Sequence, residues 1–214
     1  MPESNKIITS YLQILKKRGI KSFFNELVDN HFFDLFNNVE TQIRVGKSNN
    51  SYHYYAPIYN SVIKEAFSSI SDHKNLIFID VGCGKGKAVL LALDFNFKKI
   101  IGVELNKNLS KICRENIKNY KFSKNKKNIS IINKNALDYK VTDENVFFFF
   151  DPFSENILNI FLKKIISSIK KRKRVIYIIY ANPPKKNLIL KNNFKILKII
   201  KRNTYNCNVY KLKF

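Results

Sequence analysis

The sequence of 214 residues has little cysteine, glycine and proline, no tryptophan and few acidic residues. Its three cysteines, at 83, 113 and 207, form neither a disulfide framework nor a CxxC metal pair, so we expect a reducing, cytoplasmic location and no metal site. No basic stretch leads into an apolar core near residue 1, which argues against a signal peptide. The apolar run 175–181 is far shorter than the ~20 residues of a membrane-spanning helix. We therefore expect a soluble protein without membrane contact.

The scarcity of acidic residues leaves a formal net charge of +23, and two interpretations of it stay open. A field of this sign attracts a polyanion such as RNA. However, Ile, Lys, Asn and Phe, which have A/T-rich codons, make up over half of the chain, so compositional drift also explains the charge. The excess of 33 Lys over 6 Arg favours drift, because phosphate-reading surfaces tend to use the bidentate fork of arginine.

Two regions differ in their hydrophobic patterns. Residues 1–73 read as a helical extension, with helices expected over 7–19, 22–28 and 58–70 and a loop over 46–51. Residues 74–214 alternate short apolar runs with amphipathic segments and read as one α/β domain with a parallel sheet covered on both faces. Strands are expected over 76–81, 99–103, 129–132, 146–150, 175–180, 194–200 and 208–214, and helices over 87–95, 107–121 and 157–169.

The strongest chemical signal is a glycine-rich turn where the first strand of this domain should end. Asp80, Gly82, Gly84 and Gly86 form the pattern D-x-G-x-G-x-G, which lets the backbone turn sharply and approach a ligand closely. The spacing differs from the dinucleotide pattern G-x-G-x-x-G and from the Walker phosphate loop. It suits S-adenosylmethionine (SAM) better, with Asp80 ordering the ammonium side of the site directly or through water. The helix after the turn offers free N–H groups to such a ligand.

A second signal is Glu104, which ends the next expected strand, 18 residues after Gly86. A carboxylate at this strand tip can accept hydrogen bonds from both ribose hydroxyls, as the comparable acid does in dinucleotide folds. Without the glycine turn, the same residue would be read as a solvated loop charge.

Together these motifs resemble the class I SAM-dependent methyltransferases over residues 76–214. The resemblance is carried by residues 80–86, 102–104, 135–136 and 150–153. It implies a Rossmann-like, doubly wound, seven-stranded mixed sheet whose last strand is antiparallel, with SAM as cofactor. Residues 33–41 and 52–59 also resemble upstream segments of a group of small bacterial methyltransferases of unassigned substrate. The first of these departs from the pattern F-D-x-x-x-G-x-D-T, with Asn38 for Gly and Glu40 for Asp.

The resemblance also places the adenine and acceptor sides of the site. Asn135 matches the position of an acid that contacts the adenine amino group, and Asp138 is the alternative if the register shifts. Asp151, Pro152 and Phe153 match the segment that faces the methyl acceptor. Asp151 and the Pro152 carbonyl could stabilise charge on a nitrogen nucleophile, while Phe153 could flank a planar group or the sulfonium. Asp151 as general base for a hydroxyl, and a purely structural role for all three, stay open.

Tyrosines cluster before the cofactor domain, at 52, 54, 55 and 59, around His53. They form either a lid over the cofactor, with Tyr54 as a contact residue, or an aromatic cluster that packs the helical extension onto the sheet. His53 is a candidate base in the first interpretation.

The leading functional hypothesis is SAM-dependent methyl transfer, with nitrogen slightly favoured over oxygen, to a protein side chain, an RNA or a small molecule. The alternative is a basic RNA-binding module that kept the fold without catalysis. The run 170–174 could touch phosphates, although such runs are usually solvated loops. Asn182-Pro-Pro184 resembles an amino-methyltransferase motif but follows the wrong strand, so we interpret it as a turn.

Overall fold

The computed structural model describes residues 15–16, 19–20, 27, 32–42, 58–121, 128–184, 188–202 and 205–212. The helices expected over 7–19 and 22–28 and the loop over 46–51 lie wholly or largely outside these residues and stay predictions. In the part of the chain that is described, no helix is both long enough and apolar enough to cross a membrane.

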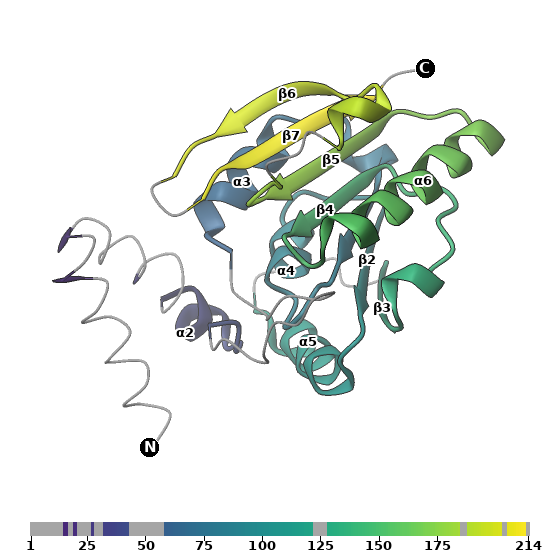
Figure 1. The fold of residues 1–214 in the computed structure, drawn as a ribbon. Coiled ribbons are helices and arrows are strands. Elements are labelled where there is room, and N and C mark those ends of the chain that lie inside the picture. Colours follow the sequence, from purple (N-terminus) through teal and green to yellow (C-terminus); the bar gives the residue numbers. More distant parts are fainter. Residues whose placement is uncertain are drawn as a thin grey trace.

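The described residues include seven strands that form one mixed sheet in the order β3-β2-β1-β4-β5-β7-β6 (Figure 1). The strands are β1 (Ile77–Val81), β2 (Lys99–Glu104), β3 (Ile129–Asn133), β4 (Val146–Phe150), β5 (Ile176–Ala181), β6 (Lys195–Ile200) and β7 (Cys207–Leu212). β1 to β5 pair in parallel, whereas β7 runs antiparallel to both of its neighbours, β5 and β6. The expected doubly wound mixed sheet with an antiparallel last strand is confirmed.

Helices cover both faces of the sheet. α3 (Asn60–Ser68), α4 (Lys87–Leu93) and α5 (Lys107–Asn119) share one hydrophobic cluster with the sheet, and α6 (Glu155–Lys171) lies in a second cluster on the opposite face (Figure 1). In β4, Val146 and Phe148 belong to the first cluster and Phe147 and Phe149 to the second. This double burial explains why the strand is apolar at every position rather than alternating.

Polar and charged residues lie at the ends of the two long helices. At the start of α5, the Asn106 side chain accepts hydrogen bonds from the backbone N–H groups of Asn108, at 2.9 Å, and Leu109, at 3.2 Å. α6 runs two residues further at each end than its apolar pattern predicts. Glu155 lies in its first turn, and Lys170 and Lys171 lie in its last. The negative charge at the N-terminus and the positive charges at the C-terminus interact favourably with the helix dipole.

The described part of the N-terminal region is attached to this core. α3 places Phe67 in the same cluster as Phe78 of β1, and Glu65 on its outer side pairs with Lys198 of β6 and with Arg202. Residues 58–70 are therefore built into the sheet's own hydrophobic core. A boundary between an extension and a domain at residue 73 stays a prediction. The short helix α2 (Phe33–Asn37) was not expected from the sequence.

The position of β1 decides where a ligand can bind. β1 lies in the middle of the sheet, with β2 on one side and β4 on the other, so the chain winds outward in opposite directions from this pair of strands. In open α/β sheets, ligands bind in the crevice outside the carboxyl ends of the strands at such a switch point. The turn after β1 and the segment after β4 both start at this edge.

Candidate active site

The turn after β1 is built from three glycines in left-handed conformations. Their φ angles are +84° at Gly82, +53° at Gly84 and +87° at Gly86, which side chains with a Cβ rarely adopt. A Cβ on Gly86 would lie 2.4 Å from the Cys113 Sγ of α5, and one on Gly82 would lie 3.0 Å from the Pro152 Cβ. The glycines therefore let the turn pack closely against α5 on one side and against the segment after β4 on the other.

Two buried carboxylates lie at this turn. Asp80 is 3 % exposed on β1 and Glu104 is 8 % exposed at the end of β2. Glu104 Oε2 accepts a hydrogen bond from the Gly84 N–H at 2.9 Å, and its Oε1 accepts one from the Asn106 N–H at 2.7 Å. Burial, and then the nearby charge of Glu104, hold the pKa of Asp80 well above its usual value. A site with these two acids favours a ligand that brings positive charge and hydroxyl donors.

Cys83, inside the turn, is a packing residue in this arrangement. It is buried and hydrogen-bonded to Cys113 on α5; this bond and the burial raise the pKa of the Cys83 thiol well above its usual value. A thiol whose pKa is raised is a poor nucleophile. Its sulfur also lies where a Cβ on Gly102 would come, 2.8 Å away, so β2 needs glycine at that position.

The segment after β4 meets the turn through Pro152, and its first residue is held in an unusual conformation. Asp151 has φ +41° and Asn182, at the end of β5, has φ +56°, both left-handed. The Asn182 side-chain N–H donates a hydrogen bond to Asp151 Oδ2 at 2.7 Å. Sequence reasoning interpreted Asn182-Pro-Pro184 as a turn and missed this contact. β4 and β5 pair in parallel with Phe150 opposite Ala181, so the next residues, Asp151 and Asn182, lie side by side. Knowing this register would have predicted the contact.

The Phe153 ring lies away from this edge of the sheet. Phe153 is 4 % exposed, and its ring centroid is 6.1 Å from that of Phe149 and 6.4 Å from that of Phe161. These contacts place the ring in the core between β4 and α6. Its expected role beside the acceptor stays a prediction, while Pro152 lies against Gly82 of the glycine turn and Asp151 is bonded to Asn182.

The sequence and fold comparisons agree with this geometry. Residues 74–159 match the model of a family described as "Putative methyltransferase". The chain has the class I methyltransferase fold. The resemblance to class I methyltransferases, which the glycine turn and Glu104 carry, is therefore confirmed. A search of curated proteins found no match.

Solved structures with this methyltransferase fold are distant in sequence. The ribosomal protein L11 methylase from Lactobacillus delbrueckii subsp. bulgaricus is 14% identical, with a TM-score of 0.56 over 80% of this chain and 82% of that chain. The magnesium protoporphyrin IX methyltransferase from Synechocystis PCC 6803, solved with bound SAM, is 12% identical, with a TM-score of 0.56 over 72% and 77% of the two chains. An RNA methyltransferase from Salinibacter ruber, in complex with S-adenosyl-L-homocysteine, is 12% identical, with a TM-score of 0.55 over 74% and 94%. At such identities the likeness establishes the fold alone.

The predicted cofactor contacts of Asn135 and Tyr54 and the predicted role of His53 stay untested. Asn135 caps the short helical turn Ala136–Asp138, where its side-chain oxygen accepts a hydrogen bond from the Leu137 N–H at 2.9 Å. Its contact with adenine stays a prediction. Tyr54 and His53 lie outside the described residues, so the lid hypothesis also stays a prediction.

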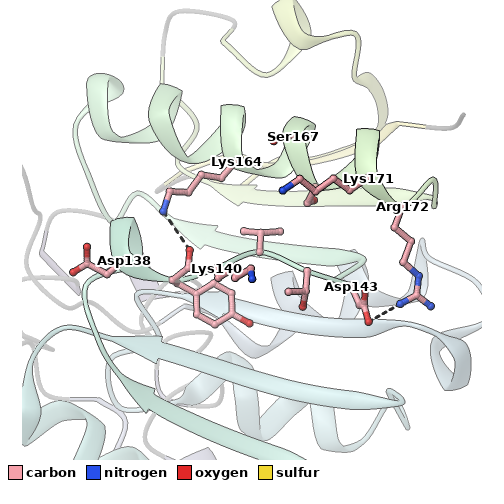
Figure 2. Close-up of a pocket in the computed structure, with 11 residues that line it drawn as sticks. Asp138, Lys140, Asp143, Lys164, Ser167, Lys171 and Arg172 are labelled. Carbon is pink, nitrogen blue, oxygen red and sulfur yellow. Dashed lines mark hydrogen bonds and ion pairs between the residues drawn. The ribbon is translucent and has the colours of Figure 1, made fainter.

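Asp138 is exposed and lies at one end of a separate groove of about 460 Å³ between α6 and the connection from β3 to β4 (Figure 2). Lys164 Nζ reaches across it to the backbone oxygens of Leu137 and Tyr139, and Arg172 pairs with Asp143 at 2.6 Å. Lys140 and Lys171 are further cations on the walls of this groove. Since Asp80, Glu104 and Asp151 do not line it, the groove is distinct from the site expected for the cofactor at the ends of β1, β2 and β4.

The upstream segment that resembles small bacterial methyltransferases docks directly on the glycine turn. Glu40 forms an ion pair with Lys85, which lies between Gly84 and Gly86. Asn38, which replaces the glycine of the resembling pattern, ends α2 in a left-handed conformation with φ +56°. Asparagine tolerates this conformation better than most residues, so the departure preserves the turn. The sequence located this segment but assigned it no contact.

Proposed function

We propose that this chain is a SAM-dependent methyltransferase that acts on a nitrogen of its acceptor. The contact that carries the proposal is the one between Gly82 and Pro152, where a Cβ on the glycine would come within 3.0 Å of the proline. It sets the cofactor turn directly against the segment expected to face the acceptor, at the switch point of the sheet. Methyl transfer requires this closeness, since the nucleophile must approach the methyl carbon in line.

The residues at the turn fit SAM in charge and in hydrogen bonding. Bound there, SAM supplies an electrophilic methyl group on a sulfonium. Asp80 offers a buried carboxylate to the ammonium of the methionine part, directly or through water. Glu104 accepts backbone hydrogen bonds from Gly84, Asn106 and Leu105, and a carboxylate has about four lone-pair positions, so it retains capacity for a ribose hydroxyl.

The preference for nitrogen rests on Asp151. A neutral nitrogen nucleophile gains positive charge as it attacks, and a carboxylate that accepts its N–H hydrogen bonds stabilises that charge. Asn182 holds one oxygen of Asp151 through the 2.7 Å hydrogen bond, which restricts the directions the carboxylate can adopt. In the alternative, Asp151 removes the proton of a hydroxyl acceptor as a general base.

Transfer of tritiated methyl from SAM into a fractionated cell lysate tests the activity and identifies the acceptor class. We expect label in one fraction (protein, RNA or small molecules) with the parent enzyme and little label with Asp151→Ala. Calorimetry should show binding of SAM and none of NAD. A protein that binds NAD instead, or transfers no label while binding SAM, would contradict the proposal.

An RNA is one proposed carrier of the acceptor nitrogen, supported by the exposed cations Lys140, Lys171 and Arg172 around the groove in Figure 2 and by Lys170 beside them. The same cations support the competing function, a basic RNA-binding module without catalysis. That module would bind RNA in a salt-sensitive manner and would have no affinity for SAM, so the calorimetry above separates the two. We also propose a cytoplasmic location, because all three cysteines are free and buried, as suits a reducing compartment.

A further inference from the structure

Two lysines of the glycine turn are buried, which is unusual for this residue type. Lys85 is 1 % exposed and Lys87 is 2 % exposed. In phosphate loops a lysine next to the glycines reaches toward the ligand. Here both ammonium groups are instead directed at residues 33–42, the segment that contains α2.

Lys85 is held by a group of contacts that joins three parts of the chain. Its Nζ donates to Glu40 Oε1. Asn116 of α5 donates from Nδ2 to the backbone oxygens of Lys85 and Glu40, each at 2.9 Å, and its Oδ1 accepts from the Glu40 N–H at 2.8 Å. The backbone of Glu40 is thus fixed on α5, and its carboxylate is placed at the lysine of the turn.

Lys87 is held by a second group of contacts from the same segment. Its Nζ lies 5.2 Å from the centre of the Phe33 ring, a cation–π distance, and its charge interacts with that of Asp34. Asp34 is itself fixed, because it accepts hydrogen bonds from the Thr41 N–H at 2.5 Å and from the Gln42 N–H at 3.1 Å. Both positive charges of the turn therefore have a negative or aromatic partner in residues 33–42.

On its other side the turn carries the two buried acids Glu104, which is hydrogen-bonded to Gly84, and Asp80; burial raises the pKa of both carboxyl groups, and a cation bound beside them would favour their ionised forms. We propose that residues 33–42 set the charge selectivity of the cofactor site, by neutralising Lys85 and Lys87 so that the acids dominate and a sulfonium is preferred over a neutral thioether. This inference rests on the proposed function. It assigns Glu40 and Asp34 as positioning residues that act through the two lysines.

Calorimetric titration with SAM and with S-adenosyl-L-homocysteine measures this selectivity, because the second ligand lacks the sulfonium charge. Glu40→Gln leaves the Lys85 charge unneutralised next to the turn. We expect the affinity for SAM to fall about three- to tenfold and that for S-adenosyl-L-homocysteine to fall less than about twofold, from the Coulomb interaction of two charges near a protein surface. The double variant Glu40→Gln/Lys85→Met, which also removes the lysine charge, should restore the parent's preference for SAM.

The matched control is Glu115→Gln, which breaks the exposed Lys111–Glu115 ion pair on the same helix, α5, and should change neither affinity. Circular dichroism and melting confirm that each variant is folded. An equal loss of both ligands in Glu40→Gln, or no change in either, would overturn the inference while leaving the proposed function intact. A parent protein that binds neither ligand would instead overturn the proposed function, and this inference with it.

Discussion

Asp80 illustrates at the scale of one residue how a site can oppose stability. The carboxyl is 3 % exposed, and burial together with Glu104 keeps its pKa well above the usual value. Burying the ionised carboxylate costs free energy, so Asp80 disfavours the folded state least while it stays protonated. Its contribution is complete below the unfolded-state pKa and is lost as the pH rises through the raised folded-state pKa.

The substitution Asp80→Asn should therefore raise the melting temperature by an amount that grows with pH across this window. Each kcal/mol regained corresponds to about 2–4 °C in a chain of this size. The same variant should bind SAM more weakly, since the carboxylate for the ammonium is gone. Melting curves from acidic to mildly alkaline pH test the first effect, with Glu115→Gln as an exposed control. A melting difference that is constant over pH would show that Asp80 is not the titrating group.

Gly84 is the residue of the glycine turn at which we expect a side chain to meet the cofactor. At φ +53° a β-branched residue is strained, and any side chain there would enter the space expected for the cofactor. Gly84→Val should abolish measurable SAM binding, and Gly84→Ala should weaken it to an intermediate degree. Calorimetry on variants whose circular dichroism matches the parent tests this series. Unchanged affinity in a folded Gly84→Val protein would refute the placement of the cofactor.

Asp151 should affect turnover more than cofactor binding. Removing one group that stabilises charge in the transition state typically costs about 10²-fold in kcat. We expect this loss in Asp151→Ala, with a nearly unchanged Kd for SAM, and a smaller loss in Asn182→Ala, which removes the 2.7 Å hydrogen bond. Glu115→Gln, which breaks the exposed Lys111–Glu115 ion pair on α5, is the control. If turnover and SAM binding fell together, Asp151 would be structural.

At the scale of elements, α3 is the helix on which the described N-terminal region depends. Phe67 is fully buried, and its ring packs against those of Phe78, Phe95 and Phe97 with centroids 5.0–5.3 Å apart. The ion pairs of Glu65 with Lys198 and Arg202 are partly exposed and add little by comparison. Aromatic packing, rather than charge, therefore attaches α3 to the sheet.

Phe67→Ala should lower the free energy of unfolding by about 3–5 kcal/mol, because the lost contacts leave a cavity that the surrounding rings fill incompletely. Glu65→Gln, on the outer face of the same helix, should cost less than about 1 kcal/mol. Urea unfolding followed by circular dichroism compares the two. Similar costs for both variants would mean that α3 is held mainly by its ion pairs.

At the scale of the whole molecule, the net charge of +23 is either a binding surface or a consequence of composition. Some of the positive side chains form contacts within the molecule. Lys85 pairs with Glu40, and Arg174 donates hydrogen bonds to the Glu144 backbone oxygen and to the Ser168 hydroxyl. Around the groove in Figure 2, Lys140, Lys171 and Arg172 are exposed, with Arg172 paired to Asp143, and such a cluster of cations is a candidate phosphate-binding surface.

If this surface binds RNA, the logarithm of the association constant for a short single strand should fall with the logarithm of the salt concentration. Three phosphate contacts give a slope of about −2. Lys140→Ala and Lys171→Ala should each reduce the slope by about 0.7, whereas Lys111→Ala, on α5, should not. Fluorescence anisotropy over a salt series measures these slopes. A slope near zero in the parent would assign the charge to compositional drift.

The sequence by itself determined the α/β class, the strands to within two residues in the described parts, and the position of the glycine-rich turn. These features are local: apolar runs, helical periodicity and glycine spacing depend on neighbours in the chain. The family resemblance that these motifs carried was sufficient to expect an antiparallel last strand. By contrast, the sequence placed residues 33–42 without assigning their partners, and it interpreted Asn182-Pro-Pro184 as an isolated turn.

Only the tertiary structure decided those contacts, because they join residues far apart in the chain. Glu40 and Lys85 are separated by 45 positions, and Asp151 and Asn182 by 31. Whether such pairs meet depends on the order and register of the strands and on how α2 docks on α5, none of which a local pattern encodes. Lys85 and Lys87 show this, because the packing directs both ammonium groups at residues 33–42.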